Sequence, residues 1–467
     1  MNQRLQRGLP GTPEASAPVR IVHLGVGNFH RAHQAWYTQH APDAEEWGIA
    51  AFTGRRPDQA EALAPQDGLY TLLTKAPDGD RAEIISSLVA VHPASEHEQY
   101  LNYLARASTA VVTLTLTEQA YRRDARGHLD TEDDGVAGDL QVLRTDPRGR
   151  VSSMPARIVA GLLARRSAGA GPLTILPCDN LPDNGHVLRT LVLDAAAAVD
   201  PALAGWVEDQ VDFATSMVDR ITPAITDEDR DLALRLTGYA DAAPVQTEPF
   251  SEWVISGEFP AGRPDWEPAG VRFVSDVGPH ELRKLWLLNG AHSLLAYAGS
   301  VRGHETIVDA VGDERLRACV EQFWDEAQRH LEMGAAEIAD YRAALLRRFE
   351  NPRMRDALAR IAKDGSQKLP VRILPVVAAE RAAGRVPVGA ATALAGWVLH
   401  LRGQGAPVSD EGAESALAAA RGELAGAADD GDLTAAVPAV LETLQAGLGE
   451  DADLVAAVVE QAGALAR

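Results

Sequence analysis

The chain has 467 residues, of which 46% are apolar and 24% charged, and its formal net charge is -22. This length suffices for two domains, and no run of about 18 apolar residues suggests a membrane span. The acidic balance argues against a nucleic acid or an anionic membrane as partner, because both require a basic face on the protein.

The N-terminal segment and the cysteines indicate the compartment. Residues 1–20 contain arginines but no apolar stretch, so they predict a frayed arm and not a signal peptide. Cys178 and Cys319 are too few for a disulfide framework or a zinc cluster, which is typical of a reducing compartment. A cytoplasmic protein is therefore expected.

Strand candidates alternate with helical stretches through the first part of the chain. RIVHLGVG (20–27) predicts a buried strand that ends in glycines and is followed by a helix. This alternation predicts an α/β fold with a doubly wound, mostly parallel sheet in residues 1–278. The further strands are predicted at 47–54, 70–75, 84–91, 110–118 and 172–180.

The second part of the chain, residues 279–467, is predicted to be a mostly α-helical domain. The change of texture falls near Asp276, after which the apolar residues follow a helical period. The acidic, alanine-rich segment 409–433 predicts solvated surface helices.

The glycine turn LGVGNFHRAH (24–33) is a candidate cofactor site. Gly25 and Gly27 supply the first two glycines of a dinucleotide fingerprint, but His30 occupies the third position. The turn alone therefore fits an ordinary strand-to-helix connection equally well. His30 and His33 are spaced to share a metal, although such a pair without a nearby acid is typical of a structural role, and no metal site is predicted.

The residues after the second predicted strand bear on cofactor choice. An acid at this point binds the adenosine ribose of NAD, whereas an arginine favours the extra phosphate of NADP. Here Arg55 and Arg56 are followed by Asp58, so both cofactors remain possible.

Three polar residues interrupt the apolar run KLWLLNGAH (284–292). In an α-helix Lys284 and His292 lie about 80° apart and Asn289 about 60° beyond, all within an arc of about 140°. Burial disfavours the charged form of a lysine, which makes it a candidate general base near neutral pH. The alternative is an amphipathic helix whose lysine reaches solvent, and spacing alone favours that alternative.

PCDNLPDNG (177–185) follows an apolar strand, at the end where open α/β sheets bind ligands. Asn180 can donate a hydrogen bond to a developing alkoxide. Asp179 and Asn184 fit Asx turns within their own loop equally well.

These residues resemble the mannitol dehydrogenase family of long-chain polyol and hexuronate dehydrogenases. The resemblance covers residues 20 to about 400, and the joint occurrence of the motifs in order is highly specific. The motifs are GVGNFHRAHQAWYT, QDGLYTLL, TLTLTE, PCDNLPDNG, VDRITP, TEPFSEWVI, KLWLLNGAH and DGSQKLPVRILP.

The resemblance implies a zinc-independent oxidoreductase with an N-terminal Rossmann-type domain and a helical C-terminal domain. It assigns Lys284 as the general base or acid. Asn180 and Asn289 form the pocket of the reacting oxygen. In oxidation Lys284 accepts the hydroxyl proton while hydride passes to the nicotinamide of NAD, or of NADP.

The resemblance also implies the binding residues. His292 orients the substrate, and a basic pair, Arg360 and Lys368, contacts the sugar chain. The expected contacts to the cofactor are Gly25, Gly27, Asn28, Phe29 and Asp58.

Glu281, one turn before Lys284, and Glu118, at the end of TLTLTE, are candidates for a proton relay, although an acid in a first helical turn explains Glu281 equally well. Both are left outside the predicted catalytic set.

The substrate is expected to be a small open-chain sugar. The segment DGSQKLP resembles the hexuronate branch of the family, which interconverts D-mannonate and D-fructuronate, more than it resembles the mannitol branch. An aldonate carboxylate requires a cation, and Arg360, Lys368, Arg372 and Arg283 are available for it. Neutral polyols also accept hydrogen bonds from such cations, so these charges do not distinguish a hexuronate from a polyol substrate. A monomer or weak oligomer is expected.

Two other classes of protein are weighed against this enzyme. A sugar-sensing protein on the same scaffold would not need Lys284. A sugar-phosphate dehydrogenase would need a second phosphate cradle, which the sequence lacks.

Overall fold

The computed structural model describes residues 3–422 and 433–466. It divides into two compact units, residues 1–278 (unit 1) and 279–467 (unit 2). Part of the predicted acidic helical segment, residues 423–432, lies outside the described residues. None of the helices in the described ranges is long and apolar enough to cross a membrane.

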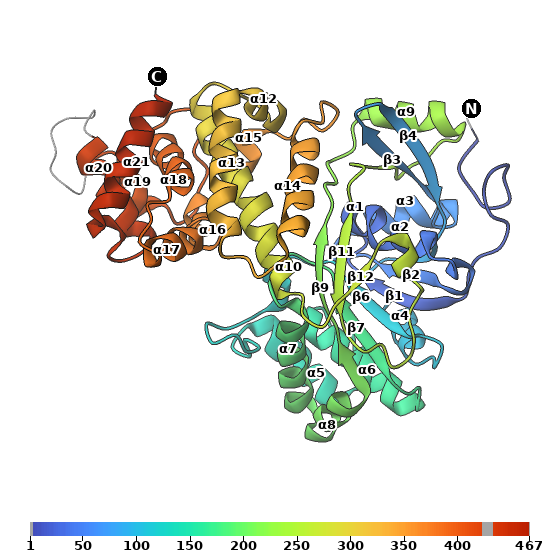
Figure 1. Ribbon diagram of the computed structural model, residues 1–467. Helices are drawn as coiled ribbons and strands as arrows, with labels where there is room; N and C mark the ends of the chain where they lie inside the picture. Colours follow the sequence, from blue (N-terminus) through green and yellow to red (C-terminus); the bar gives the residue numbers. More distant parts are fainter. Residues whose placement is uncertain (1–2, 423–432, 467) are drawn as a thin grey trace. The chain divides into compact units, whose positions relative to one another are not determined.

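A six-stranded parallel sheet forms the centre of unit 1 (Figure 1). Its order is β5-β2-β1-β6-β7-β8, and every neighbouring pair is parallel, as predicted. This order is that of a dinucleotide-binding sheet, in which the ligand lies at the carboxyl ends of the strands beside the first one. The strands are β1 (Val19–Leu24), β2 (Gly48–Phe52), β5 (Leu88–His92), β6 (Val111–Leu114), β7 (Leu173–Pro177) and β8 (Val211–Phe213).

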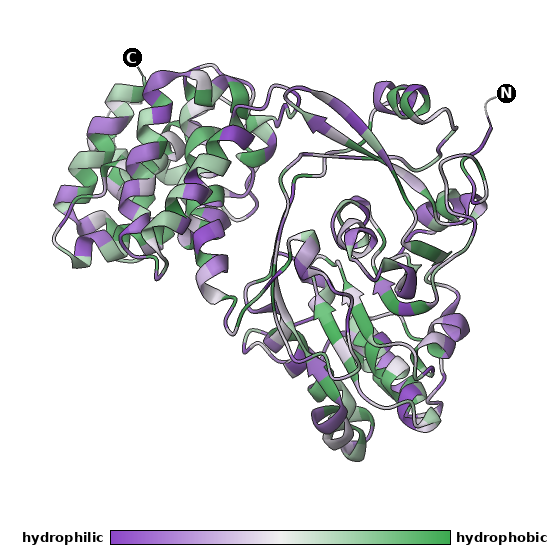
Figure 2. Ribbon diagram, turned by 45° about the vertical axis from the view of Figure 1, so that its right-hand side comes forward, coloured by the Kyte–Doolittle hydropathy of each residue, from purple (hydrophilic) through white to green (hydrophobic). Residues whose placement is uncertain are grey.

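Successive side chains of each strand point to opposite faces of this sheet, and each face packs against its own apolar core. Val22 and Leu24 of β1 point into one core, while Ile21, the residue before Val22, belongs to the other. Because a strand has a side-chain period of two, this alternation fixes which face each residue occupies. Figure 2 shows the strands mainly in green, the colour of hydrophobic residues. The helices of unit 1 are α1 (Asn28–Ala32), α2 (Gln34–His40), α3 (Asp58–Leu63), α4 (His97–Leu104), α5 (Asp134–Thr145), α6 (Met154–Ala168), α7 (Asn184–Val199), α8 (Pro201–Gln210) and α9 (Asp227–Thr237).

Two small sheets complete unit 1, and one of them corrects a prediction. The strand expected at 84–91 is two strands, because β4 ends at Ile85 and β5 begins at Leu88 in a different sheet. Gln39 Oε1 accepts a hydrogen bond from the N–H of Ser86, which gives the break its own partner. The small sheets contain β3 (Tyr70–Ala76), β4 (Gly79–Ile85) and β10 (Val245–Thr247), and β9 (Thr215–Asp219), β11 (Glu252–Ser256) and β12 (Arg272–Phe273).

The N-terminal arm is docked against unit 1, so the prediction of a frayed arm was wrong. Leu5 is fully buried. Arg7 donates hydrogen bonds to the carbonyls of Ser86 and Leu88, and its N–H donates to Asp67. The bonds from the Arg7 side chain satisfy two backbone carbonyls at the break between β4 and β5. Composition alone does not reveal this role.

Unit 2 is helical. The predicted long helix through 284–292 is present, but residues Lys284–Gly290 and Leu295–Gly299 adopt π-helical hydrogen bonding, and Ala291–Leu294 between them is α11. The other helices are α10 (Gly278–Arg283), α12 (Ile307–Gly312), α13 (Glu314–Gln328), α14 (Ala335–Phe349), α15 (Leu358–Ile361), α16 (Gly365–Arg372), α17 (Leu374–Ala382), α18 (Val388–Leu401), α19 (Glu414–Ala420), α20 (Leu433–Leu444) and α21 (Ala452–Leu465).

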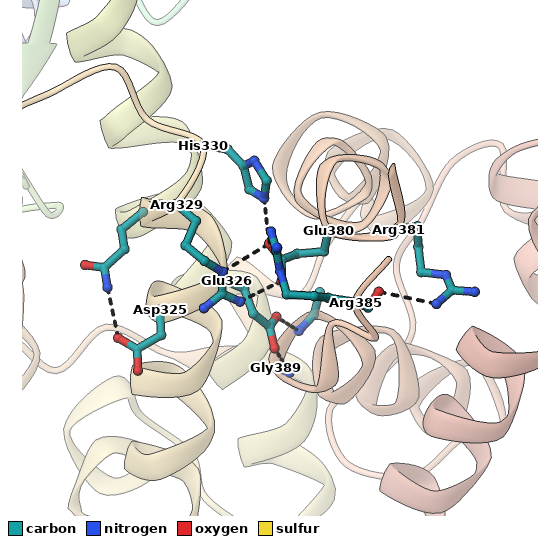
Figure 3. Close-up of polar contacts among 10 residues, drawn as sticks. Asp325, Glu326, Arg329, His330, Glu380, Arg381, Arg385 and Gly389 are labelled. Carbon is teal, nitrogen blue, oxygen red and sulfur yellow. Dashed lines mark hydrogen bonds and ion pairs between the residues drawn. The ribbon is translucent and has the colours of Figure 1, made fainter. Parts of the chain in front are cut away.

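A polar cluster around two buried glutamates, Glu326 and Glu380, joins α13, α17 and α18 (Figure 3). Glu380 is fully buried and accepts hydrogen bonds from Arg329, His330 and Arg385, which hold the pKa of its carboxyl far below the usual range, Arg385 most strongly. Glu326 accepts the N–H groups of Gly389 and the next residue at the start of α18. A carboxylate from α13 therefore satisfies the first free donors of α18.

Candidate active site

The glycine turn connects β1 to α1 at the carboxyl edge of the parallel sheet. The N–H of Gly25 donates to the carbonyl of Phe52 at 2.9 Å, and Thr115 Oγ1 donates to the carbonyl of Gly25 at 2.8 Å. Gly25 has φ +100°, and a Cβ there would lie 2.3 Å from the carbonyl oxygen of Thr115. This glycine is therefore required by the fold. A Cβ on Gly27 would meet only the Gly25 carbonyl at 3.7 Å, so this glycine leaves space above the turn.

His30 fills the place of the third fingerprint glycine by packing. Its ring stacks on His23 of β1, with 3.3 Å between ring centroids. His23 is held by Thr113 and Thr115, at 2.8 and 3.1 Å. Both rings are fully buried, and burial lowers the pKa of His23 to about 3 and that of His30 well below its ordinary value. Two neutral imidazoles thus replace the close helix–strand contact that a glycine provides.

The other histidine of the turn also has a structural setting. The ring of His33 contacts the Glu252 carbonyl through Nε2 at 3.0 Å and the Gln34 amide through Nδ1 at 3.0 Å. Across residues 3–422 and 433–466, the structure contains no group of three or more His, Cys, Asp or Glu side chains placed to hold a metal ion.

Arg31, which the sequence reasoning missed, lies directly behind the turn. It is 1% exposed, and its guanidinium donates to the Gly27 carbonyl at 3.2 Å and to Asn28 Oδ1 at 2.9 Å. The third partner is the carbonyl of Ala243. An arginine four residues after Gly27, one helical turn from the glycine turn, was the signal available in the sequence.

The pair that bears on cofactor choice is exposed. Asp58 is the first residue of α3, after the loop that follows β2, and its carboxylate lies 3.5 Å from Arg56 Nε. The acid and the arginine that the sequence left as competing indicators therefore contact each other.

Asn180 lies in the loop after β7, and its side chain is exposed. The residues around it hold this loop. Asn184 is fully buried, accepts the N–H of Ser216 at 3.0 Å and donates to the carbonyl of Asp179 at 3.2 Å. The carboxylate of Asp179 accepts the N–H of Leu181 at 3.3 Å, an Asx-type contact. Asp179 therefore makes the predicted Asx contact, and Asn184 supports the loop by bonds both to Asp179 and to Ser216 of β9.

The 3₁₀ turn Glu118–Tyr121, after β6, contacts the same loop. Tyr121 is 1% exposed and donates a short hydrogen bond to the carboxylate of Asp179. Burial raises the pKa of Asp179 to about 6. Tyr121 ends a short 3₁₀ turn that begins at Glu118. The strand predicted to reach Glu118 ends at Leu114, so this acid lies beyond the strand, on an exposed turn.

The polar residues of unit 2 share one helix of unexpected geometry. Lys284, Asn289 and His292 are each partly buried, whereas Trp286, Leu287 and Leu288 are buried. Their angular spacing was predicted for an α-helix, and that geometry was wrong, because Lys284–Gly290 is π-helical. In a π-helix backbone bonds join residues i and i+5, so Lys284 and Asn289 are one hydrogen-bonded step apart along the axis.

Neighbouring helices explain why the π-helix is stable there. Trp324 Nε1 donates to the carbonyl of Leu287 at 2.7 Å. A Cβ on Gly290 would lie 2.5 Å from the ring of Phe323. The ring of His292 packs against Phe349, with centroids 5.0 Å apart.

The predicted basic pair occupies two short helices of unit 2. Arg360 on α15 is exposed and forms a two-oxygen ion pair with Asp356, while Lys368 on α16 donates to the carbonyls of Ile361 and Lys363. Burial lowers the pKa of Lys368, with Arg372 as the next cause.

Two further cations were predicted to be available for a carboxylate. Arg372 donates to Ser293 Oγ at 3.3 Å, beside His292. Arg283 is 2% exposed, lies 3.4 Å from Glu337 and stacks over Tyr341 at 4.0 Å. An arginine with these contacts serves the packing of α14, so Arg283 is a poor candidate for the substrate.

Both units match one family over nearly their whole length. Residues 19–268 match the mannitol dehydrogenase Rossmann domain, and residues 276–466 match the mannitol dehydrogenase C-terminal domain. The chain belongs to the mannitol dehydrogenase family. It is therefore an oxidoreductase, and the predicted fold, a Rossmann-type domain followed by a helical domain, is confirmed.

Individual members of the family are similar to it across most of the chain. D-mannonate oxidoreductase of Escherichia coli (strain K12) is 40% identical over 394 residues, which cover 82% of this chain and 80% of that protein. Mannitol 2-dehydrogenase of Cereibacter sphaeroides is 38% identical over 392 residues, with 82% and 81% covered. The solved ternary complex of Pseudomonas fluorescens mannitol 2-dehydrogenase with NAD and D-mannitol has a TM-score of 0.78 at 31% identity, and the match covers 99% of this chain and 94% of that one.

The predicted site residues thus fall into two groups. The glycine turn, Asp58 and Asn180 lie at the carboxyl edge of the sheet in unit 1. The second group belongs to unit 2, where the π-helix contributes Lys284, Asn289 and His292, and α15 and α16 contribute Arg360 and Lys368.

Proposed function

We propose that this mannitol dehydrogenase family member is a nicotinamide-dependent dehydrogenase that interconverts a secondary alcohol of an open-chain sugar acid or polyol with the 2-keto sugar. The observation that carries the proposal is the π-helix Lys284–Gly290, which places a lysine and an asparagine one hydrogen-bonded step apart on a partly exposed face. π-Helical turns are frequent at functional sites.

The glycine turn fits a dinucleotide. Gly27 leaves open the space that a Cβ would fill, and its backbone is extended, with φ -134°. Gly25, Gly27, Asn28 and Phe29 would hold the pyrophosphate, and Asp58 the adenosine ribose. An acid at that position favours NAD over NADP, although Arg56 beside it would tolerate a phosphate. When bound, the nicotinamide accepts hydride from the alcohol carbon, or returns it in reduction.

The residues of the chain handle the proton and the oxygen. Lys284, when neutral, accepts the hydroxyl proton during oxidation and returns it during reduction. Asn180 and Asn289 donate hydrogen bonds to the alkoxide-like oxygen, so that charge develops against fixed dipoles. His292, held against Phe349, orients a neighbouring hydroxyl.

The favoured substrate pair is D-mannonate and D-fructuronate. The 40% identity to D-mannonate oxidoreductase supports it. A carboxylate would need a cation, and Lys368 and Arg372, one turn apart on α16, supply two, whereas Arg360 is already paired with Asp356. A mannitol 2-dehydrogenase is the alternative, supported by the 38% identity to that enzyme from Cereibacter sphaeroides.

A panel of sugars crossed with both cofactors tests the proposal. Purified protein is mixed with NADH or NADPH and with fructuronate, tagaturonate, fructose or xylulose, and absorbance at the nicotinamide band is followed. Turnover of fructuronate with NADH at the highest kcat/KM is expected. Preference for fructose would select the alternative, and no turnover with any 2-keto sugar would refute the enzyme assignment.

The role of the lysine has its own test. Lys284→Ala should lower kcat by roughly 10²–10⁴-fold, the usual contribution of a general base. Lys363→Ala, an exposed lysine of unit 2, is the matched control and should keep its activity. Full activity of Lys284→Ala would contradict the mechanism.

A further inference from the structure

The first helix after the glycine turn is too short to act as a dipole for an anion. α1 has five residues and ends at Ala32, because the next residue, His33, has φ -122° and ψ -86° and breaks the helix before α2 begins. The macrodipole of a helix is the sum of its aligned peptide dipoles, so a helix of five residues has only a small one. The usual electrostatic partner of a dinucleotide pyrophosphate is therefore weak in this protein.

Buried side chains satisfy the peptide carbonyls of this interrupted helix. Tyr70 Oη donates to the Arg31 carbonyl at 2.6 Å, and Arg220 donates to the carbonyl of Ala32. Arg31 itself donates back to Gly27 at the start of the helix. The break is thus stabilised by donors from other elements, as the free carbonyls of a helix end require.

Arg31 brings a positive charge to the turn in a setting that contains only neutral acceptors. Its guanidinium is bonded to two backbone carbonyls and the Asn28 amide, and the Tyr70 ring lies 5.3 Å away. In the part of the chain that the structure describes, no carboxylate lies within ion-pair distance of it. Burial lowers the pKa of Arg31 to about 10, with Tyr70 and Asp241 opposing that effect, so the group stays charged at neutral pH.

A buried charge without an ionic partner is costly, and an anion beside it would offset the cost. The guanidinium contacts two of the four residues to which the pyrophosphate is assigned, Gly27 and Asn28. We propose that Arg31 is a positioning residue that holds the glycine turn and supplies the buried positive charge for the cofactor pyrophosphate, in place of the helix dipole. This inference rests on the proposed function of the turn as a dinucleotide site.

The test compares ligands that differ in charge. Calorimetric titrations measure the affinity of adenosine, ADP, ADP-ribose and NADH for the parent chain, Arg31→Gln and Arg31→Lys. Arg31→Gln should lower the affinities for ADP-ribose and NADH by roughly ten- to hundredfold, while the affinity for adenosine changes by less than about threefold. Arg31→Lys, which also loses the planar fork but keeps the charge, should recover most of this loss.

Arg165→Gln is the matched control. Arg165 is also fully buried and donates only to backbone carbonyls, including Gly171 and Leu104, but it lies on α6. It should lower thermal stability without changing the ratio of ADP-ribose to adenosine affinity. Equal weakening of all ligands by Arg31→Gln, or equal affinities for the Gln and Lys variants, would overturn the inference.

Asn28→Asp provides an outcome that does not depend on the folding of the arginine variants. The new carboxylate would pair with Arg31 at an unchanged shape, so Tm without ligand should rise while pyrophosphate affinity falls and adenosine affinity stays. An unchanged or lower Tm would contradict an uncompensated charge at Arg31. Failure of the parent chain to bind NADH or ADP-ribose would instead refute the proposed cofactor site.

Discussion

The two glycines of the turn should respond to alanine in opposite ways. In Gly25→Ala the new Cβ would lie 2.3 Å from the Thr115 carbonyl, at a φ of +100°. A left-handed backbone costs a non-glycine residue about 1–2 kcal/mol, and overpacking adds about 1–3 kcal/mol. The free energy of unfolding should therefore fall by about 2–5 kcal/mol, which lowers Tm by roughly 4–20 °C for a unit of this size.

Gly27→Ala is the companion variant. Its φ is -134° and its Cβ would have no contact closer than 3.7 Å, so the fold should accept it with stability changed by less than about 1 kcal/mol. The same methyl occupies the space above the turn. If the pyrophosphate approaches there, NADH affinity should fall at least about tenfold, or about 1.4 kcal/mol.

Thermal unfolding and NADH fluorescence titration of both variants separate fold from binding. The expected pattern is a destabilised Gly25→Ala and a stable Gly27→Ala that binds NADH poorly. Unchanged NADH affinity in Gly27→Ala would refute the assignment of the cofactor to this turn. A fully stable Gly25→Ala would refute the close approach of Gly25 to Thr115, the residue after β6.

Three further variants test the packing. Gly290→Ala should lose about 1–3 kcal/mol of unfolding free energy in urea, because its Cβ would overlap the Phe323 ring; parent-like stability would contradict that packing. Glu380→Gln should lose roughly 1–3 kcal/mol at pH 7, because Glu380 is buried but its partners Arg329 and Arg385 are partly solvated. Because the pKa of Glu380 is lower in the folded chain than in the unfolded one, this stabilisation is present above about pH 4.3 and is lost as pH falls, so parent and variant should converge in acid. The pH dependence from Asp179 has the opposite sign, because its pKa in the folded chain is raised to about 6. The free energy of unfolding of the parent chain should therefore fall as pH rises from about 4 to 6. Asp179→Asn should be up to roughly 2–3 kcal/mol more stable than the parent chain at pH 7.5. A less stable Asp179→Asn would show that the bond from Tyr121 outweighs the cost of burying the charge.

The central sheet was predictable because its pattern is local. Strand candidates such as RIVHLGVG are apolar and end in glycines, and a parallel strand buried on both faces leaves that signature in the sequence. The break between β4 and β5 was not predictable in the same way. Residues 84–91 were predicted as one strand although Ser86 and Ser87 interrupt their apolar residues. The switch of sheet at these serines involves contacts from Gln39 and Arg7, which are distant in sequence.

The candidate site shows the same division between local and distant information. Gly25, Asn180 and Lys284 were predicted as site residues by chemical type and by motif. The partners that hold them are distant in sequence: Thr115 for the turn, and Tyr121 and Ser216 for the loop that contains Asn180. No periodicity of the chain encodes those pairings.

The geometry of the KLWLLNGAH helix depends on packing as well as on local preference. For an α-helix, a spacing of five places Lys284 and Asn289 about 140° apart, which argues against a shared site. Trp324 bonds to the Leu287 carbonyl and Phe323 packs against Gly290, so α13 contacts the segment at two successive points. The wider hydrogen-bonding step of the π-helix then aligns residues five apart, and it leaves Asn289 and His292, three apart, on the partly exposed side with Lys284. The same spacing that favoured an ordinary amphipathic helix in the sequence therefore favours a shared site once the helix is π.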